Sequence, residues 1–186
     1  MREREILQNP SHLRNQLVDI HNQMDQARRY STELTEAFKA GDIAMKSIIN
    51  VINHLQNAKK WGNWDQMSKG GGYYDRRKYG AIDRAVNEAY RSKQLLHVFA
   101  NELDDVGINL GQIDMNIESF GGFLDQLFDN LITDWIVQNK IANALRNSQN
   151  THDRVLRILQ TLEADIKKHT DLLAVLQDNK DQLLTA

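Results

Sequence analysis

The sequence predicts an all-α protein, namely an elongated antiparallel coiled-coil-like helical bundle of three to four long helices. Apolar residues recur with alternating spacings of four and three, as they do at the core positions of coiled coils. The 186 residues contain a single proline, so few positions oppose helix formation. Half of the ten glycines are concentrated between positions 61 and 80, which indicates one main interruption of the helical pattern.

The first two helices are predicted at 11–40 and 42–60. Pro10 suits the first turn of a helix, and Ser11 can cap its exposed N–H groups. Gly41 followed by Asp42 is typical of a helix end and a new N-cap. Alternatively, Gly41 marks a bend within one helix, at a cost of about 1 kcal/mol. The predicted core positions of the first helix are Leu13, Leu17, Ile20, Met24, Ala27, Ser31, Leu34 and Phe38.

A third helix is predicted at 81–146 and a fourth at 152–184, separated by the polar run 147–151 with Thr151 as a cap. Glycines at 107, 111, 121 and 122 indicate kinks, or places where another helix packs closely. The core positions of the third helix are Ile82, Ala85, Ala89, Ser92, Leu96, Phe99, Leu103, Val106, Leu110, Ile113, Ile117, Phe120, Leu124, Leu127 and Leu131. Those of the fourth are Val155, Leu159, Leu162, Ile166, His169, Leu173, Leu176, Lys180 and Leu183.

These helices are expected to form a single elongated domain over residues 1–186. Heptads sustained for this length specify a supercoil, and each helix needs apolar partners along its whole length. An open side of the core positions would favour a homodimer.

The segment 61–80, which we call the aromatic–glycine segment, is predicted to be a loop because three consecutive glycines oppose helix. Between positions 59 and 78 the six basic residues outnumber the two aspartates, so the local charge is +4. Aromatic rings, basic side chains and glycine backbone N–H groups together suit an anion or a nucleic acid. The alternative is a structural tip whose tryptophans pack under the bundle end. The candidate binding residues are Trp61, Trp64, Asp65, Lys69, Gly70, Gly71, Gly72, Arg76, Arg77 and Lys78.

The same segment carries a family resemblance. Trp61-Gly62-Asn63-Trp64-Asp65, the triple glycine, and Lys78 before Ile82-Asp83 resemble a signature of uncharacterised helical coiled-coil proteins of Gram-positive and related bacteria. Phe128-Asp129 through Asp134-Trp135 is similar in those proteins. The resemblance spans residues 55–140 and is specific only in the segment itself. Residues 73–77, Tyr-Tyr-Asp-Arg-Arg, are more polar than the family pattern, and the resemblance implies no activity.

Composition and motifs give no support to common enzyme and metal classes. The net charge of −2 provides no global attraction to nucleic acid or membrane. The chain contains no cysteine, which excludes disulfides and thiolate metal sites, and no Glu-x-x-His motif of di-iron bundles. His21 with Asp25, and Asp165 with His169, have the i,i+4 spacing of a metal pair, but solvated contacts account for such pairs more simply. We therefore assign no catalytic residues, no metal and no cofactor, and an enzyme with its site at Asp65, Asp75 and the glycines is the least favoured of three functional alternatives.

The charged start Met1-Arg2-Glu3-Arg4-Glu5 lacks an apolar signal region, and no apolar run is long enough to span a membrane. The expected location is the cytoplasm. The expected function is a structural or protein-interaction scaffold that binds itself or another helical protein. The alternative is a binding module whose segment 61–80 contacts nucleic acid, phosphate or an anionic membrane surface.

Overall fold

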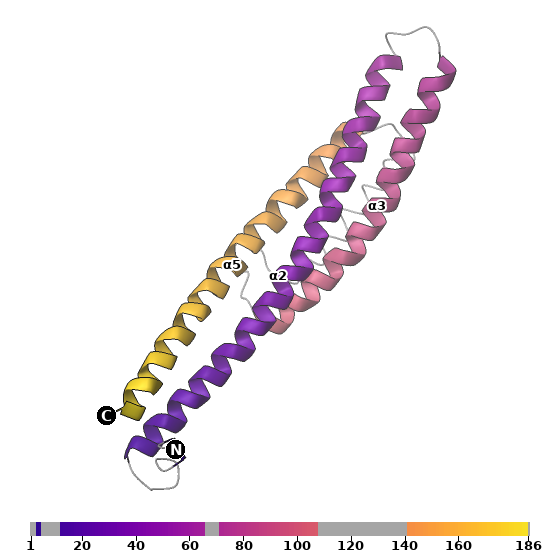
Figure 1. Cartoon of the computed structure of the whole chain (residues 1–186). Helices are drawn as coiled ribbons and strands as arrows, with labels where there is room; N and C mark the ends of the chain where they lie inside the picture. Colours follow the sequence, from indigo (N-terminus) through magenta and orange to yellow (C-terminus); the bar gives the residue numbers. More distant parts are fainter. Residues whose placement is uncertain (1–2, 5–11, 66–70, 108–140, 186) are drawn as a thin grey trace. The chain divides into compact units, whose positions relative to one another are not determined.

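The protein is all-α throughout the residues described by the structure, a computed structural model that covers 3–4, 12–65, 71–107 and 141–185. Its helices are α2 (His12–Asp65), α3 (Gly71–Val106) and α5 (Ile141–Thr185), of 54, 36 and 45 residues (Figure 1). The predicted fold class is thereby confirmed at the level of an all-helical protein whose helices pack against one another.

The predicted break at Gly41 is wrong, because α2 continues through this residue without interruption. The alternative, in which glycine is tolerated inside one helix, agrees with the structure. A Cβ atom at position 41 would lie 2.7 Å from Cε2 of Phe99 and 2.8 Å from Cδ2 of Leu159. Gly41 is therefore a site of close helix packing, and this packing offsets the low helix propensity of glycine.

The predicted loop over 61–80 is also wrong for most of its length. Helix α2 extends to Asp65, and α3 begins at Gly71, ten residues before the predicted start at 81. Residues 66–70 lie outside the described residues. Glycines at the first positions of a helix cost less than glycines in its interior, because the first N–H groups there have no partner within the helix in any case.

The predicted helix over 81–146 is interrupted at Gly107. Helix α3 ends at Val106, and Gly107 has a φ of 61° while its N–H donates to the carbonyl oxygen of Asp104 at 3.0 Å. A residue in this left-handed conformation ends a helix, and glycine adopts it without steric cost. Residues 108–140 lie outside the described residues, including the predicted core positions from Leu110 to Leu131.

The predicted turn at 147–151 is wrong, because α5 is continuous from Ile141. Thr151 is buried inside the helix, where its hydroxyl donates to the carbonyl oxygen of Asn147 at 3.0 Å. Threonine can satisfy its hydroxyl in this way one turn back along a helix, so a cap motif in the sequence does not require a helix start.

The described residues belong to two compact units, each of which we describe separately. Unit 2 (Ala37–Gln160) contains the second half of α2, all of α3 and the first part of α5. In this unit Ser47 contacts Ser92 and Gly41 lies against Phe99, so α2 and α3 run in opposite directions (Figure 1). The buried apolar residues of unit 2 are Ala37, Ala44, Ile48, Val51, Leu55, Ala58, Ala81, Ala85, Ala89, Leu96, Phe99, Ala100, Leu103, Val106, Ala144, Val155, Ile158 and Leu159.

Helix α3 follows the predicted heptads closely. Every predicted core position from Ala85 to Val106 is buried. At the first position, Ala81 is buried in place of Ile82, which is half-buried. The first half of this buried face consists of alanine and serine, and small side chains allow two helix backbones to approach each other closely.

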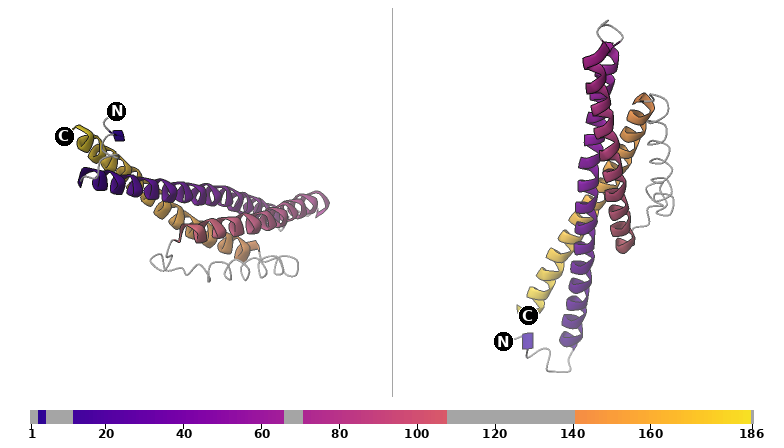
Figure 2. Two further views of the ribbon diagram at one scale, coloured as in Figure 1. Left: turned by 90° about the horizontal axis from the view of Figure 1, so that it is seen from below. Right: turned by 90° about the vertical axis from the view of Figure 1, so that its right-hand side faces the viewer.

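Unit 1 (Met1–Glu36 and Thr161–Ala186) contains the first part of α2 and the last part of α5, which lie side by side in both views of Figure 2. Its buried apolar residues are Leu17, Met24, Ala27, Leu34, Leu162 and Leu176. Several other predicted core positions are only half-buried, namely Ile20, Ser31, Ile166, His169, Leu173 and Leu183. Two larger apolar side chains of this unit's α5 are exposed, Leu172 at 42% and Val175 at 55%.

Candidate functional site

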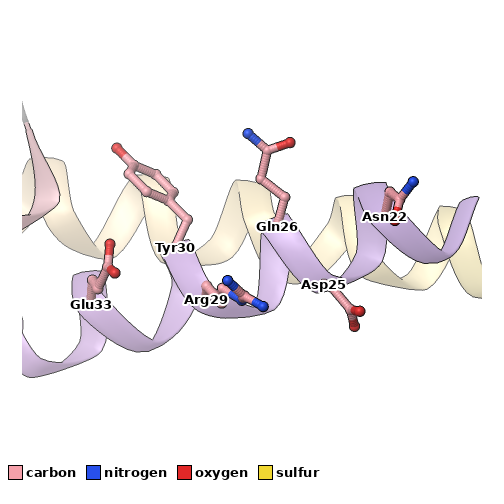
Figure 3. Close-up of a pocket in the computed structure, with 6 residues that line it drawn as sticks. All are labelled: Asn22, Asp25, Gln26, Arg29, Tyr30 and Glu33. Carbon is pink, nitrogen blue, oxygen red and sulfur yellow. The ribbon is translucent and has the colours of Figure 1, made fainter. Parts of the chain in front are cut away.

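The outer face of α2 in unit 1 is a hollowed surface of about 400 Å³. It is lined by Asn22, Asp25, Gln26, Arg29, Tyr30 and Glu33. These residues all come from one helix, and their spacing of three and four places them on one side of it. Asn22, Gln26 and Tyr30 project from one edge of the face and Asp25 from the other (Figure 3). The surface is polar, with charges of alternating sign at positions 25, 29 and 33.

Beside this face lies a second hollow of about 380 Å³, which we call the Tyr30 groove. It is lined by Gln23, Gln26, Ala27, Tyr30, His169 and Leu172, and thus by both helices of unit 1. The rings of Tyr30 and His169 meet edge to face, with centroids 4.7 Å apart and planes inclined by 61°. Aromatic rings prefer this arrangement because the positive edge of one faces the negative face of the other.

Two titratable side-chain groups line the Tyr30 groove, the Tyr30 phenol and the His169 ring. Burial raises the pKa of the Tyr30 phenol, and the nearby carboxylates of Asp165 and Glu33 raise it further. The Nδ1 atom of His169 is buried and has no hydrogen-bond partner among the described residues. The Tyr30 phenol therefore ionises less readily than an ordinary tyrosine, and its hydroxyl can donate a hydrogen bond.

Glu3 joins both helices of unit 1. Its Oε1 atom lies 3.0 Å from Nε2 of His21 on α2 and 3.0 Å from Nζ of Lys180 on α5. The hydrogen bond with Lys180 lowers the pKa of the Glu3 carboxyl. His21 thus contacts Glu3, and Asp25 contacts Arg28 at 3.6 Å, so the i,i+4 pair of His21 and Asp25 has other partners.

In unit 2 a cluster of polar side chains lies between α2 and α3. The Ser47 hydroxyl donates to Oε1 of Glu88 at 2.7 Å and lies 2.7 Å from Oγ of Ser92. The Ser92 hydroxyl lies 2.9 Å from the carbonyl oxygen of Glu88, to which it can donate. Both serines are buried, so these bonds replace water that the hydroxyls lose on folding.

The heptad pattern places Ser92 on the buried side of its helix but does not reveal this cluster. The signal was available in part, because Ser47 continues a run of small residues at 37, 41 and 44 on α2. Glu88 could not be identified from the sequence as the third member, since exposed glutamates are common on helices.

The candidate binding residues of the aromatic–glycine segment divide between two helices. Trp61, Trp64 and Asp65 occupy the last turns of α2, and Gly71, Gly72 and 76–78 the first turns of α3. Lys69 and Gly70 lie outside the described residues. Since α2 and α3 are antiparallel neighbours in unit 2, the backbone brings the two groups to the same end of that unit.

No group of three or more His, Asp or Glu side chains in the described part of the chain could hold a metal ion. None of the helices within the described ranges combines the length and apolarity that crossing a membrane requires.

Comparison with known proteins gives no relative for this chain: no protein family, no curated protein and no solved structure matches it.

Proposed function

We propose that this protein is a cytoplasmic helical scaffold that assembles with itself or with another helical protein. In this proposal the whole chain forms an elongated, antiparallel, coiled-coil-like bundle of three to four long helices. We also propose that the chain is related to the helical coiled-coil proteins of Gram-positive and related bacteria that it resembles. This resemblance implies no activity.

The observation that carries the proposal is the apolar surface of unit 1. The described residues of unit 2 come from three helices, and the heptad positions of α3 from Ala85 to Val106 are buried. The described helices of unit 1 are two, and Leu172 and Val175 on α5 are exposed while Leu173 beside them is only half-buried. Adjacent exposed apolar side chains on a heptad helix favour the docking of a further helix.

The test is a double substitution, Leu172→Ser with Val175→Ser, examined by sedimentation equilibrium and thermal melting. Assembly should weaken because each lost apolar side chain removes roughly 1.5–3 kcal/mol of burial. Helicity at low concentration should be unchanged because both side chains are exposed there. Asn179→Ser, at an exposed polar position of the same helix, is the control. The proposal fails for self-assembly if the double variant assembles as the parent does.

A second candidate function has one specific observation in its favour. Helix α3 begins at Gly71, so the backbone places Gly71 and Gly72 in its first turn and Arg76 to Lys78 within the next. First-turn N–H groups attract anions, and nearby cations add to that attraction. This arrangement favours a contact with nucleic acid, phosphate or an anionic membrane surface.

Replacement of Arg76, Arg77 and Lys78 by Ala tests this second function by titration with a polyanion at low salt. Binding should weaken and depend less on salt, because fewer counterions are released. Arg157, Lys167 and Lys168, replaced together by Ala, remove the same charge elsewhere and form the control. Equal binding by both triple variants would contradict a specific role for residues 76–78.

A further inference from the structure

The outer face of α2 is available for contact. Asn22, Asp25, Gln26 and Arg29 are exposed, and Tyr30 and Glu33 are half-buried. By helical spacing the centre of this face lies on the opposite side of α2 from the buried Met24. Tyr30, at one edge of the face, contacts His169 of α5, whereas Asn22, Asp25 and Arg29 are exposed on the side away from Met24.

The order of its hydrogen-bonding groups is self-complementary. A two-fold axis perpendicular to α2, level with the midpoint between positions 27 and 28, would relate α2 to the same helix of a second, antiparallel copy. Across this axis a residue meets one on the same flank of the antiparallel copy, at about the same distance beyond the midpoint and within one residue of it. The resulting pairs are Asn22 with the partner's Glu33, Asp25 with the partner's Arg29, and Gln26 with the partner's Tyr30.

Each of these pairs joins a donor to an acceptor. The Asn22 amide can donate to the glutamate, the Arg29 guanidinium can donate to the aspartate, and the Tyr30 hydroxyl can donate to the amide oxygen of Gln26. Because the axis is two-fold, every pair occurs twice. All six lining residues are used and none is left opposite a group of its own kind.

The charges favour the same arrangement. Asp25, Arg29 and Glu33 follow one another at intervals of four residues, with signs that alternate. On the antiparallel copy, the partner's Arg29 lies one residue, or about 1.5 Å along the axis, from Asp25. A parallel copy in register would instead place each charge beside its own kind, which is unfavourable.

From this charge and hydrogen-bond complementarity we propose that the outer face of α2 binds a second copy of this chain in antiparallel orientation. The proposal rests on the scaffold function above and names its partner. Six polar residues on each side form a small contact, which belongs to the weak and transient class of interfaces. Its ion pairs are exposed, so the association should weaken as salt is added.

Charge reversal provides the first test, by sedimentation equilibrium of the full chain at low salt. Asp25→Arg alone and Arg29→Asp alone should each weaken the dimer by roughly tenfold or more, since a symmetric interface contains each change twice. The combined D25R/R29D variant exchanges the two charges and should recover the dimer. Asp42→Arg, a reversal elsewhere on α2, should leave it unchanged. Absence of recovery in the combined variant, or a parent that stays monomeric, would overturn the proposal.

Cross-linking separates this proposal from the scaffold function. The chain has no cysteine, so single-cysteine variants report one position each. Gln26→Cys lies close to the proposed axis and should be linked to its own copy by a short thiol reagent, whereas Val175→Cys should not. Linkage of Val175→Cys alone would overturn the two-fold contact on α2 and leave assembly through the apolar surface standing. Linkage of neither variant would overturn the two-fold contact as well.

Discussion

Gly41 and Phe99 are in such close contact that a single methyl group does not fit between them. A Cβ atom at position 41 would come within 2.7 Å of one ring carbon of Phe99 and 2.8 Å of another. Leu159, from the third helix of unit 2, closes the same space at 2.8 Å. All three helices of this unit thus meet at one glycine.

Gly41→Ala should therefore destabilise the protein, although alanine is the better helix former. The gain in helix propensity is about 1 kcal/mol, and the cost of overpacking a rigid ring is about 1–3 kcal/mol. Urea unfolding should show a net loss. Gly80→Ala is the matched control, because its nearest neighbour would be Nη1 of Arg84 at 3.8 Å. That variant should gain up to about 1 kcal/mol, and a gain of the same size for Gly41→Ala would contradict the packing described.

The polar cluster between α2 and α3 gives a second prediction. Ser47→Ala should cost about 1–2 kcal/mol, because it removes the hydroxyl between Glu88 and Ser92 and leaves a buried Ser92 with fewer partners. A double-mutant cycle with Glu88→Gln should show coupling of roughly 0.5–1.5 kcal/mol. Thr32→Ala is the control, since its hydroxyl is exposed and donates to the Arg28 carbonyl oxygen one turn away. Additive effects at positions 47 and 88 would argue against the hydrogen bond.

Gly107 gives a third prediction, from its backbone alone. Its φ of 61° is unfavourable for residues with a Cβ atom, and Gly107→Ala should cost roughly 1 kcal/mol. Apart from its chain neighbours, no heavy atom of the described residues lies within 4 Å of the position a Cβ would occupy, so the prediction rests on the backbone angle. Gly107→Asn should cost less than Gly107→Ala, because asparagine tolerates the left-handed region. Chemical denaturation of the two variants checks this order.

The fourth prediction concerns pH. Because Lys180 lowers the pKa of Glu3 in the folded protein, the contact of Glu3 stabilises the fold above the ordinary glutamate pKa of 4.5. The contribution is lost as the pH falls through the lower folded value. It should be small, under about 1 kcal/mol, since Glu3 is 37% exposed and screened by solvent.

Glu3→Gln and Lys180→Gln should each remove this part of the pH dependence, and the double variant should remove no more than either alone. An NMR titration of the Glu3 carboxyl measures the shift directly. A Glu3 pKa at or above 4.5 in the folded parent would rule out the contact.

The heptads of α3 were predictable from the sequence because burial on a helix repeats with a fixed period. From Ala85 to Val106 that period alone identified the buried side, and it also placed His169 on the inner side of α5, where its ring contacts Tyr30. The glycines were less informative. Glycine occurs in three different settings. Gly41 lies in a packed helix interior, Gly71 at a helix start and Gly107 at a helix end. Only their neighbours in space, such as Phe99, distinguish the first case from the others.

The surfaces of unit 1 could not be predicted for a related reason. Periodicity states which side of α2 is buried against one partner, but the hollow at Asn22 to Glu33 lies on the polar side. Polar helix sides resemble one another in sequence, and the complementarity of Asp25 with Arg29 becomes visible only once the helix is known to be continuous and exposed there. The side chains of the aromatic–glycine segment are outside what the structure describes, so its binding role stays a prediction.

The alanine-rich buried side of α2 and α3 has a thermal consequence. Ala44, Ala58, Ala81, Ala85 and Ala89 are buried, yet each removes little apolar area from water compared with leucine. The heat capacity change of unfolding follows the apolar area that becomes exposed. For this protein it should fall below the usual ~12–15 cal/mol/K per residue. The stability curve would then be broad, so that cooling and moderate warming change the free energy of unfolding only slightly.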